Sequence, residues 1–131
     1  MREIKFRCWN PTNNRMIKIG DKSNDTALWI DENGFYVLDH FAGFPQPIAD
    51  HLDGLILMQY VGLKDKNGVE IYEGDIIEDE NGMIAKVYFA EGVAQFRLDF
   101  FNVGHFEELY DMDTTEVIGN IHEHSQLMET K

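Results

Sequence analysis

The sequence predicts a mainly β protein, because apolar and polar residues alternate along much of the chain and helical periodicity is scarce. Turn-forming residues separate the alternating runs, and the tetrapeptide Asp-Glu-Asn-Gly occurs twice, at residues 31–34 and 79–82. With 131 residues, of which 44% are apolar and 27% charged, the chain suits one soluble domain with a sizeable core. This composition excludes disorder for most of the chain.

The first predicted element is a half-buried strand over residues 3–8. Its apolar face holds Ile4, Phe6 and Cys8, and its outer face holds Lys5 and Arg7. Residues 10–14, with one proline and three asparagines, supply a turn, so that residues 15–19 return as the second strand of a hairpin.

Each Asp-Glu-Asn-Gly copy is expected to join two antiparallel strands, because Asn-Gly takes the positive φ values of tight hairpins. The first copy joins residues 27–30 to 35–38, and the second joins the strand before Asp79 to residues 83–89. A further hairpin loop is expected at residues 90–92, with Gly92 in the left-handed conformation.

The other expected elements are mostly short strands. Residues 39–53 are predicted to be a mobile loop or a short irregular helix, and Gly62 to Gly68 are predicted to form a turn. Strands are predicted at residues 55–60, 69–72, 76–77, 93–98 and 116–121. Residues 125–128 are predicted to form one helical turn.

Five short strands from Asp75 onward, joined by tight turns and closing against the last one, suggest a small SH3-like barrel. The predicted organisation is therefore a single domain over residues 1–131. Within it, residues 1–60 form an N-terminal β-hairpin extension, residues 61–124 the SH3-like barrel and residues 125–131 a tail.

Three ordered motifs carry a resemblance to a known family. Residues 58–77 (MQYVGLKDKNGVEIYEGDII), residues 2–10 (REIKFRCWN) and residues 116–123 (EVIGNIHE) closely resemble the signature, opening strand and closing motif of the YopX family of phage and prophage proteins. The departures are mild: Cys8 replaces a usual alanine, Val61 a threonine and His122 a tyrosine. The resemblance implies a mostly β fold with an SH3-like barrel, a phage or prophage origin in a bacterial cell, and no established biochemical role.

The formal charge of −13 is unevenly distributed. Residues 1–20 contain five Lys or Arg residues and one Glu. Residues 21–131 contain six Lys or Arg residues and 23 Asp or Glu residues. Direct binding of duplex DNA is not expected, because such affinity comes mainly from phosphate contacts by cations. A protein partner with a basic surface fits this charge pattern better, and the basic start could pair with the acidic edge of a second copy to give a homo-oligomer. With no apolar run of bilayer length and no signal-peptide pattern, we expect a cytoplasmic protein that binds no membrane.

Neither the cysteine nor the histidine pair predicts a catalytic, metal or cofactor site. Cys8 lies on the apolar face of its strand and is interpreted as a buried structural thiol rather than a nucleophile. His122 and His124 would share one strand face as metal ligands do, yet they follow the last strand, and solvent-exposed tail histidines are the favoured interpretation.

Two groups of carboxylates are a candidate cation-binding or phosphate-mimicking surface, but neither has the spacing of a calcium loop. They are Glu78, Asp79 and Glu80, and Glu107, Glu108, Asp111 and Asp113. A solvated acidic surface is the favoured interpretation. Four phenylalanines could stack on bases, although core packing is the stronger expectation. They are Phe96, Phe100, Phe101 and Phe106.

The favoured function is a non-enzymatic, protein-binding or host-modulating accessory module that uses barrel loops and acidic edges. A nucleic-acid-associated accessory protein using the basic first hairpin is the alternative, and a small hydrolase is the second alternative. No catalytic, cofactor-binding or metal-binding residue is assigned, and no cofactor is expected.

Overall fold

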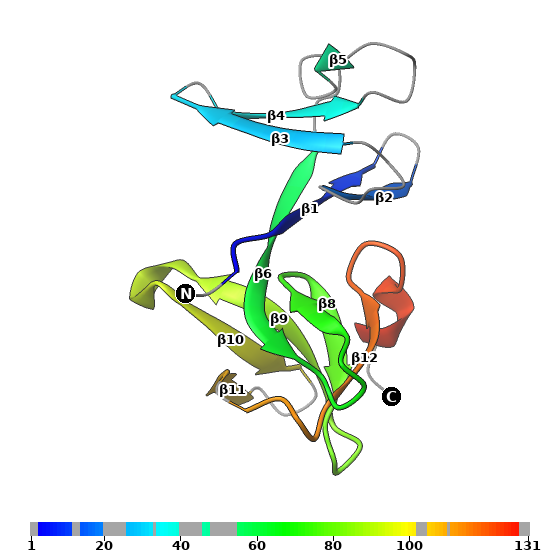
Figure 1. Cartoon of the computed structure of the whole chain (residues 1–131). Helices are drawn as coiled ribbons and strands as arrows, with labels where there is room; N and C mark the ends of the chain where they lie inside the picture. The colour runs from blue at the N-terminus through cyan, green and yellow to red at the C-terminus, as the bar shows by residue number, and fades with distance from the viewer. Residues whose placement is uncertain are drawn as a thin grey trace. The chain divides into compact units, whose positions relative to one another are not determined.

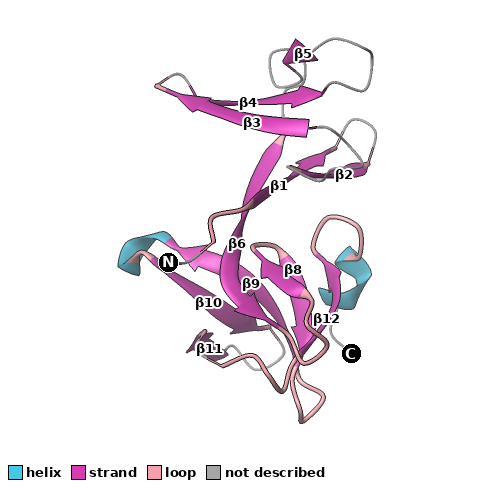
Figure 2. Ribbon diagram, in the orientation of Figure 1, coloured by secondary structure: helices cyan, strands magenta, loops and turns pink. Residues whose placement is uncertain are grey.

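The computed structural model of the chain describes residues 3–11, 14–19, 26–32, 34–39, 46–47, 55–101, 105–109 and 111–128. Strands make up most of the regular structure (Figure 2), which confirms the predicted mainly β fold. The chain divides into a barrel unit, made of Met1–Ile4 and Tyr60–Lys131, and an N-terminal unit, Lys5–Gln59. Among the described residues, no helix has the length and apolar character needed to cross a membrane.

The N-terminal unit contains two antiparallel hairpins. Strand β1 (Phe6–Asn10) pairs with β2 (Arg15–Lys18), and β3 (Thr26–Asp31) pairs with β4 (Gly34–Asp39), as predicted. A two-residue strand, β5 (Gln46–Pro47), adds to β4. The loop was predicted at positions 39–53; Asp39 belongs to β4, and apart from β5 the rest of the loop lies outside the described residues.

Strand β1 is buried along most of its length, so the predicted half-buried strand is wrong. Arg7, expected on the solvent face, is 7% exposed and Trp9 is 5% exposed, whereas Ile4 precedes the strand and is 64% exposed. The physical reason is that β1 is a central strand, paired with β2 on one side and with β6 on the other. The alternation of polar and apolar residues in the sequence shows which side chains are polar, but it does not exclude their burial. A long Arg side chain can bury its aliphatic part.

Strand β6 (Ile56–Lys64) begins in the N-terminal unit, where it pairs with β1, and continues into the barrel unit, where it pairs with β7 (Glu70–Tyr72). The pairing shifts register between Tyr60 and Lys64, and Gly62 has φ +93° within this bulge. The turn predicted from Gly62 to Gly68 therefore starts too early, because a positive-φ glycine here bulges the strand without ending it. The turn itself follows β6, from Asp65 to Gly68.

Five antiparallel strands form the curled sheet of the barrel unit (Figure 1). Their order is β11 (His105–Glu108), β10 (Gln95–Phe100), β9 (Ile84–Ala90), β8 (Asp75–Glu78) and β12 (Glu116–Asn120). The final strand pairs with β8, the first strand of this set. The predicted mainly β fold with a small barrel is confirmed as a curled half-barrel, whereas β11 lies outside the residue ranges predicted to be strands.

The core of the barrel unit lies on the inner face of this sheet. It is composed of Ile71, Ile77, Ala85, Val87, Leu98, Phe100 and Met112, all at most 5% exposed. Partly buried apolar residues from β6, from β12 and from the positions just before β9 and just after β11 pack against it. The core is therefore built mainly from residues at every second position of the paired strands, as the pleat of a sheet requires.

The loop between β9 and β10 differs from the prediction. Residues Glu91–Val93 form a 3-10 turn, and Ala94, with φ +52°, holds the left-handed conformation that was expected at Gly92. Because Ala90 pairs with Gln95, the loop has four residues and not three. In a four-residue loop built on a helical turn, the last residue takes the left-handed conformation that leads the chain into the next strand. The strained residue of this loop is therefore Ala94.

Asp65 connects the β6–β7 turn to the last strand. Its Oδ1 atom accepts hydrogen bonds from the backbone N–H groups of Asn67 (2.8 Å) and Val69 (2.9 Å), and Oδ2 accepts one from Val117 (2.9 Å). The backbone N–H of Lys66 also donates to the carbonyl of Thr115 (3.0 Å). These bonds fasten the turn to β12 across 52 positions of sequence.

Candidate functional site: an acidic pocket

The barrel unit carries a pocket of about 260 Å³. Three parts of the chain line it: the turn between β8 and β9, the adjacent strands β10 and β11, and the segment before β12. These parts come together because β10 lies between β9 and β11 in the sheet. The site is therefore a product of sheet order rather than of one sequence motif.

Carboxylates are the largest group among the residues that line this pocket, which we call the acidic pocket. They are Asp79, Glu80, Glu107, Glu108 and Asp111. The two acidic groups seen in the sequence are thus brought together, with two members, Glu78 and Asp113, outside the lining. Among the described residues, no Lys or Arg lines the pocket, so its field favours a positively charged ligand.

The first wall is a hydrogen-bonded turn. Asp79 Oδ1 accepts from the backbone N–H groups of Asn81 (2.9 Å) and Met83 (2.8 Å), and the N–H of Gly82 donates to the Asp79 carbonyl (3.0 Å). Gly82 has φ +79°, as predicted for the glycine of this turn. One carboxylate oxygen of Asp79 is therefore hydrogen-bonded within the turn, whereas Glu80 at the tip is exposed.

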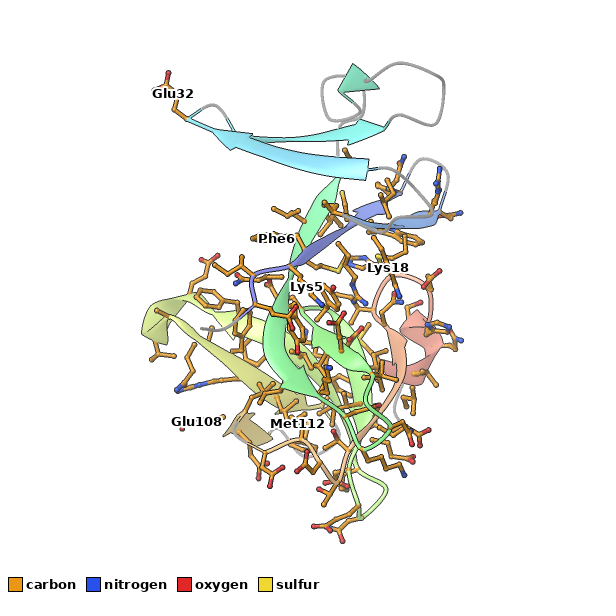
Figure 3. The ribbon with its side chains drawn as sticks, viewed as in Figure 1. Lys5, Phe6, Lys18, Glu32, Glu108 and Met112 are labelled. Carbon is orange, nitrogen blue, oxygen red and sulfur yellow. The ribbon has the colours of Figure 1, made fainter. Side chains whose placement is uncertain are left out.

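The second wall is strand β11. The register pairs Glu107 with Leu98 and Glu108 with Arg97. Directly paired residues share a face of the sheet, so Glu107 lies on the same face as the buried Leu98 and Glu108 on the other. Figure 3 shows Glu108 projecting from β11 at the edge of the barrel unit, with Met112 further inside.

The third wall is a second tight turn, between Asp111 and Thr115. Asp111 Oδ1 accepts from the backbone N–H of Asp113 (3.0 Å), and Thr115 Oγ1 donates to the carbonyl of Met112 (2.8 Å). Together these bonds hold the segment in place and direct the 3% exposed Met112 side chain into the core. The carboxylate of Asp111 remains exposed at the rim.

The base of the pocket is apolar. Leu98, Phe100 and Met112 line it, and each also belongs to the hydrophobic core. A pocket with an apolar base and an acidic rim suits the aliphatic stem and charged head of a Lys or Arg side chain. Within the described part of the chain, no three His, Cys, Asp or Glu side chains are grouped closely enough to hold a metal ion.

Cys8 is confirmed as a buried thiol, with 0% exposure. Burial raises the pKa of Cys8 to about 11, against the smaller opposing effect of a backbone hydrogen bond with Ile56. A thiol with such a pKa is overwhelmingly protonated at neutral pH, and only the thiolate is nucleophilic. Cys8 therefore has a packing role beside Ile17 in the N-terminal unit.

The two histidines do not share a strand face, because β12 ends at Asn120 and both follow it in a turn. The side chain of Asn120 organises this turn by accepting from the N–H groups of His122 (3.0 Å) and Glu123 (2.9 Å). His124 Nδ1 accepts from the N–H of Asn120 (3.1 Å). This bond uses one of the two ring nitrogens of His124 in the structure of the turn.

The four phenylalanines do not form one platform. Phe100 is in the core, Phe101 is partly buried, and the side chain of Phe106 lies outside the described residues. Phe96 packs edge to face against Phe89, its partner in the β9–β10 pairing, with ring centroids 5.2 Å apart. Cross-strand packing therefore accounts for Phe96, and core packing accounts for Phe100.

Comparison with known proteins identifies the family. The model of the family described as YopX protein matches residues 5–129. The chain belongs to the YopX family. The resemblance of the three sequence motifs is thereby confirmed over nearly the whole chain.

Two solved structures share the fold. Protein EF1440 from Enterococcus faecalis is 26% identical, with a TM-score of 0.65, and the match covers 98% of this chain and 100% of that one. The protein yopX from Bacillus subtilis is 22% identical, with a TM-score of 0.69 and the same coverage. No curated protein matches the sequence.

Sequence reasoning missed the polar and structural residues of the site. Asn81, Thr114 and Thr115 also line the acidic pocket, and Asp65 fastens the neighbouring β12. One local signal was available: Asp65-Lys66-Asn67-Gly68 repeats the Asp-x-Asn-Gly pattern of the turn at Asp79. The pattern predicts a carboxylate that bonds its own turn.

Proposed function

We propose that this YopX-family chain is a non-enzymatic, protein-binding accessory module encoded by a phage or prophage. Its acidic pocket receives a lysine or arginine side chain from a partner with a basic surface. The observation that carries the proposal is the gathering of five carboxylates around a pocket whose base is apolar. Charge complementarity selects such a partner and speeds its association.

Burial of Arg7 supports this proposal over the nucleic-acid alternative. The first hairpin was the basic surface on which DNA binding would depend, and Arg7 is only 7% exposed. Arg15 and Lys18 of β2 are exposed, which leaves fewer cations for phosphate contacts than the roughly six to ten that strong DNA binders use.

The test uses a fluorescein-labelled nine-residue peptide that alternates arginine and threonine, titrated with the protein and followed by anisotropy. The pocket variant carries Glu80→Gln, Glu108→Gln and Asp111→Asn, three exposed positions at the rim. If each exposed pair contributes about 0.5 kcal/mol, the pocket variant binds about tenfold more weakly. Binding should also weaken as salt is raised.

The matched control changes three exposed carboxylates outside the pocket, Glu32→Gln, Glu91→Gln and Asp113→Asn. It has the same net charge as the pocket variant, and we expect its affinity to stay within about twofold of the unmodified protein. Equal weakening by both variants would show nonspecific attraction and overturn the proposal. Micromolar binding of mixed-sequence duplex DNA at about 150 mM salt would favour the nucleic-acid alternative.

A further inference from the structure

Two tight turns of the barrel unit end in the dipeptide Asn-Gly: residues 65–68, which we call the Asp65 turn, and residues 79–82, the Asp79 turn. In each turn the backbone N–H of the asparagine donates to the carboxylate of the aspartate, at 2.8 Å and 2.9 Å, and that of the glycine donates to the aspartate carbonyl, at 3.0 Å in both. Both Asn-Gly pairs are exposed. The third pair of the sequence includes Asn33, which lies outside the described residues.

An asparagine that precedes glycine can react with its own backbone. The glycine nitrogen loses its proton and attacks the side-chain carbonyl carbon of the asparagine, which closes a cyclic imide. The bond from that carbon to the side-chain nitrogen breaks, and the nitrogen leaves with the proton as ammonia. Water then opens the ring at either carbonyl and gives aspartate or isoaspartate. Glycine favours the attack because it has no Cβ to shield the nitrogen or to restrict the backbone.

The turns oppose this reaction while they are closed. Each glycine N–H donates a hydrogen bond to the aspartate carbonyl, which stabilises the protonated nitrogen and holds it in place. The nitrogen is therefore released only when the turn opens locally. The rate at each asparagine should then follow the population of the opened turn, which differs between regions of one protein according to their contacts.

The two turns differ in the contacts that resist opening. Asp65 Oδ2 accepts from the N–H of Val117 (2.9 Å), and the N–H of Lys66 donates to the carbonyl of Thr115 (3.0 Å). These two bonds fasten the Asp65 turn to β12 and to the residue before it. In the part of the chain that the structure describes, the hydrogen bonds of the Asp79 turn all lie between residues 79 and 83. The Asp79 turn therefore opens more readily than the Asp65 turn.

We propose that Asn81 is a site of spontaneous deamidation in the folded protein, whereas Asn67 is protected by the bonds between its turn and the β12 region. The reaction consumes one water and releases one ammonia, and it needs no enzyme or partner. Asn81 lines the acidic pocket, so its conversion adds a carboxylate to that lining. The inference goes beyond the proposed function and does not depend on it, because only the turn and water take part.

The experiment compares the two asparagines within one chain. The whole protein is incubated at mildly alkaline pH, folded and in parallel unfolded in guanidinium chloride, and samples are digested with pepsin at acidic pH to stop the reaction. Mass spectrometry of the peptides measures the conversion of each amide to an acid, and chromatography separates the isoaspartate form. In the unfolded chain we expect Asn67 and Asn81 to react within about threefold of each other. In the folded protein Asn81 should react at least about tenfold faster, because two additional bonds keep the Asp65 turn closed.

A matched pair of variants tests the cause of the protection. Asp65→Asn keeps an oxygen for the turn but removes the acceptor of the Val117 bond, so Asn67 in the folded variant should react at least about fivefold faster, with Asn81 unchanged. Asp79→Asn should leave the rate at Asn67 unchanged. Equal rates at the two asparagines of the folded protein would overturn the proposal. So would an unreacted Asn81 in folded protein after the unfolded chain has converted. An unchanged rate at Asn67 in Asp65→Asn would overturn the protective role of the bond to β12.

Discussion

The bond between Asp65 and β12 can be separated from the bonds that Asp65 makes to its own turn. Oδ1 accepts both turn hydrogen bonds, from Asn67 and Val69, and Oδ2 accepts the bond from Val117. An Asp65→Asn substitution keeps an oxygen for the turn and places an amide NH2 against the N–H of Val117. Asp65 is 4% exposed, so the unsatisfied donors are poorly hydrated, and we expect a loss of about 2 kcal/mol of unfolding free energy.

Asp79 is the matched control for this substitution. Its Oδ1 accepts the two equivalent turn bonds, from Asn81 and Met83, and Asp79 is more exposed than Asp65. Asp79→Asn keeps the turn oxygen and should cost only about 0.5 kcal/mol, from the loss of charge. Urea unfolding at pH 7, followed by circular dichroism, measures both losses. Losses that agree within about 0.5 kcal/mol would refute the contribution of the bond to β12.

The assay must report on the barrel unit. Both tryptophans, Trp9 and Trp29, lie in the N-terminal unit, so their fluorescence follows that unit. Hydrogen exchange of peptides covering β7 and β12 is therefore measured alongside circular dichroism. We expect Asp65→Asn to accelerate exchange in both strands under conditions in which Asp79→Asn leaves β12 unchanged.

The same carboxylate gives a dependence on pH. Burial alone would raise the pKa of Asp65, but the hydrogen bonds from Val117, Val69 and Asn67, with the nearby charge of Lys66, lower it overall below its usual 3.8. The charged form is thus favoured in the folded state. Its contribution to stability is fully present above the unfolded pKa and is lost as the pH falls through the lower folded value. The cost of Asp65→Asn should therefore be constant from pH 7 to 5 and shrink as the pH falls below the usual pKa of 3.8.

Three further predictions concern glycine positions and the neighbouring Ala94, and are measured by urea unfolding. Gly82→Ala should cost about 1 kcal/mol, because φ is +79° there. Gly92→Ala and Ala94→Gly should each stabilise by about 0.5 kcal/mol, because the left-handed residue is Ala94 and a Cβ at Gly92 meets no atom within 4 Å. Destabilisation by both would contradict the loop. Gly119→Ala should cost about 2 kcal/mol, because its Cβ would lie 2.7 Å from His124 Nδ1, and adding His124→Ala should recover part of that loss.

Strands β8, β9, β10 and β12 could be predicted because their signals are local, whereas β11 was not predicted. Glycine-containing turns separate β8 from β9 and β9 from β10, and the tight turn after Glu78 shows the expected φ at Gly82. The burial of β1 could not be predicted in the same way. Its second neighbour is β6, about 50 positions later in the sequence, and a strand paired on both sides is covered more fully than its own polarity pattern indicates.

The acidic pocket could be predicted only in part. Its carboxylates are visible in the sequence as two separate acidic groups, and each has a solvated surface as its simplest interpretation. Their meeting depends on the β10–β11 register, which pairs Glu107 with Leu98, and on the turn that fixes Asp111. Neither the register nor the turn leaves a distinctive local pattern, so composition identified the residue type and only the fold identified the site.

The repeated tetrapeptide Asp-Glu-Asn-Gly forms two different turns, so its sequence alone does not determine the turn type. In the N-terminal unit Asp31 pairs directly with Gly34, so two residues connect β3 and β4. In the barrel unit Asp79 bonds to Met83, so the same four letters form a longer turn. Asp65-Lys66-Asn67-Gly68 differs in one letter yet makes the same set of bonds as the Asp79 turn. The Asn-Gly pair permits both the two-residue turn and the longer turn. Shifting a strand by one residue would turn every side chain to the opposite face of the sheet, so the register is set by which face is buried. The flanking strands therefore choose the register, and the turn adopts the form that this register allows.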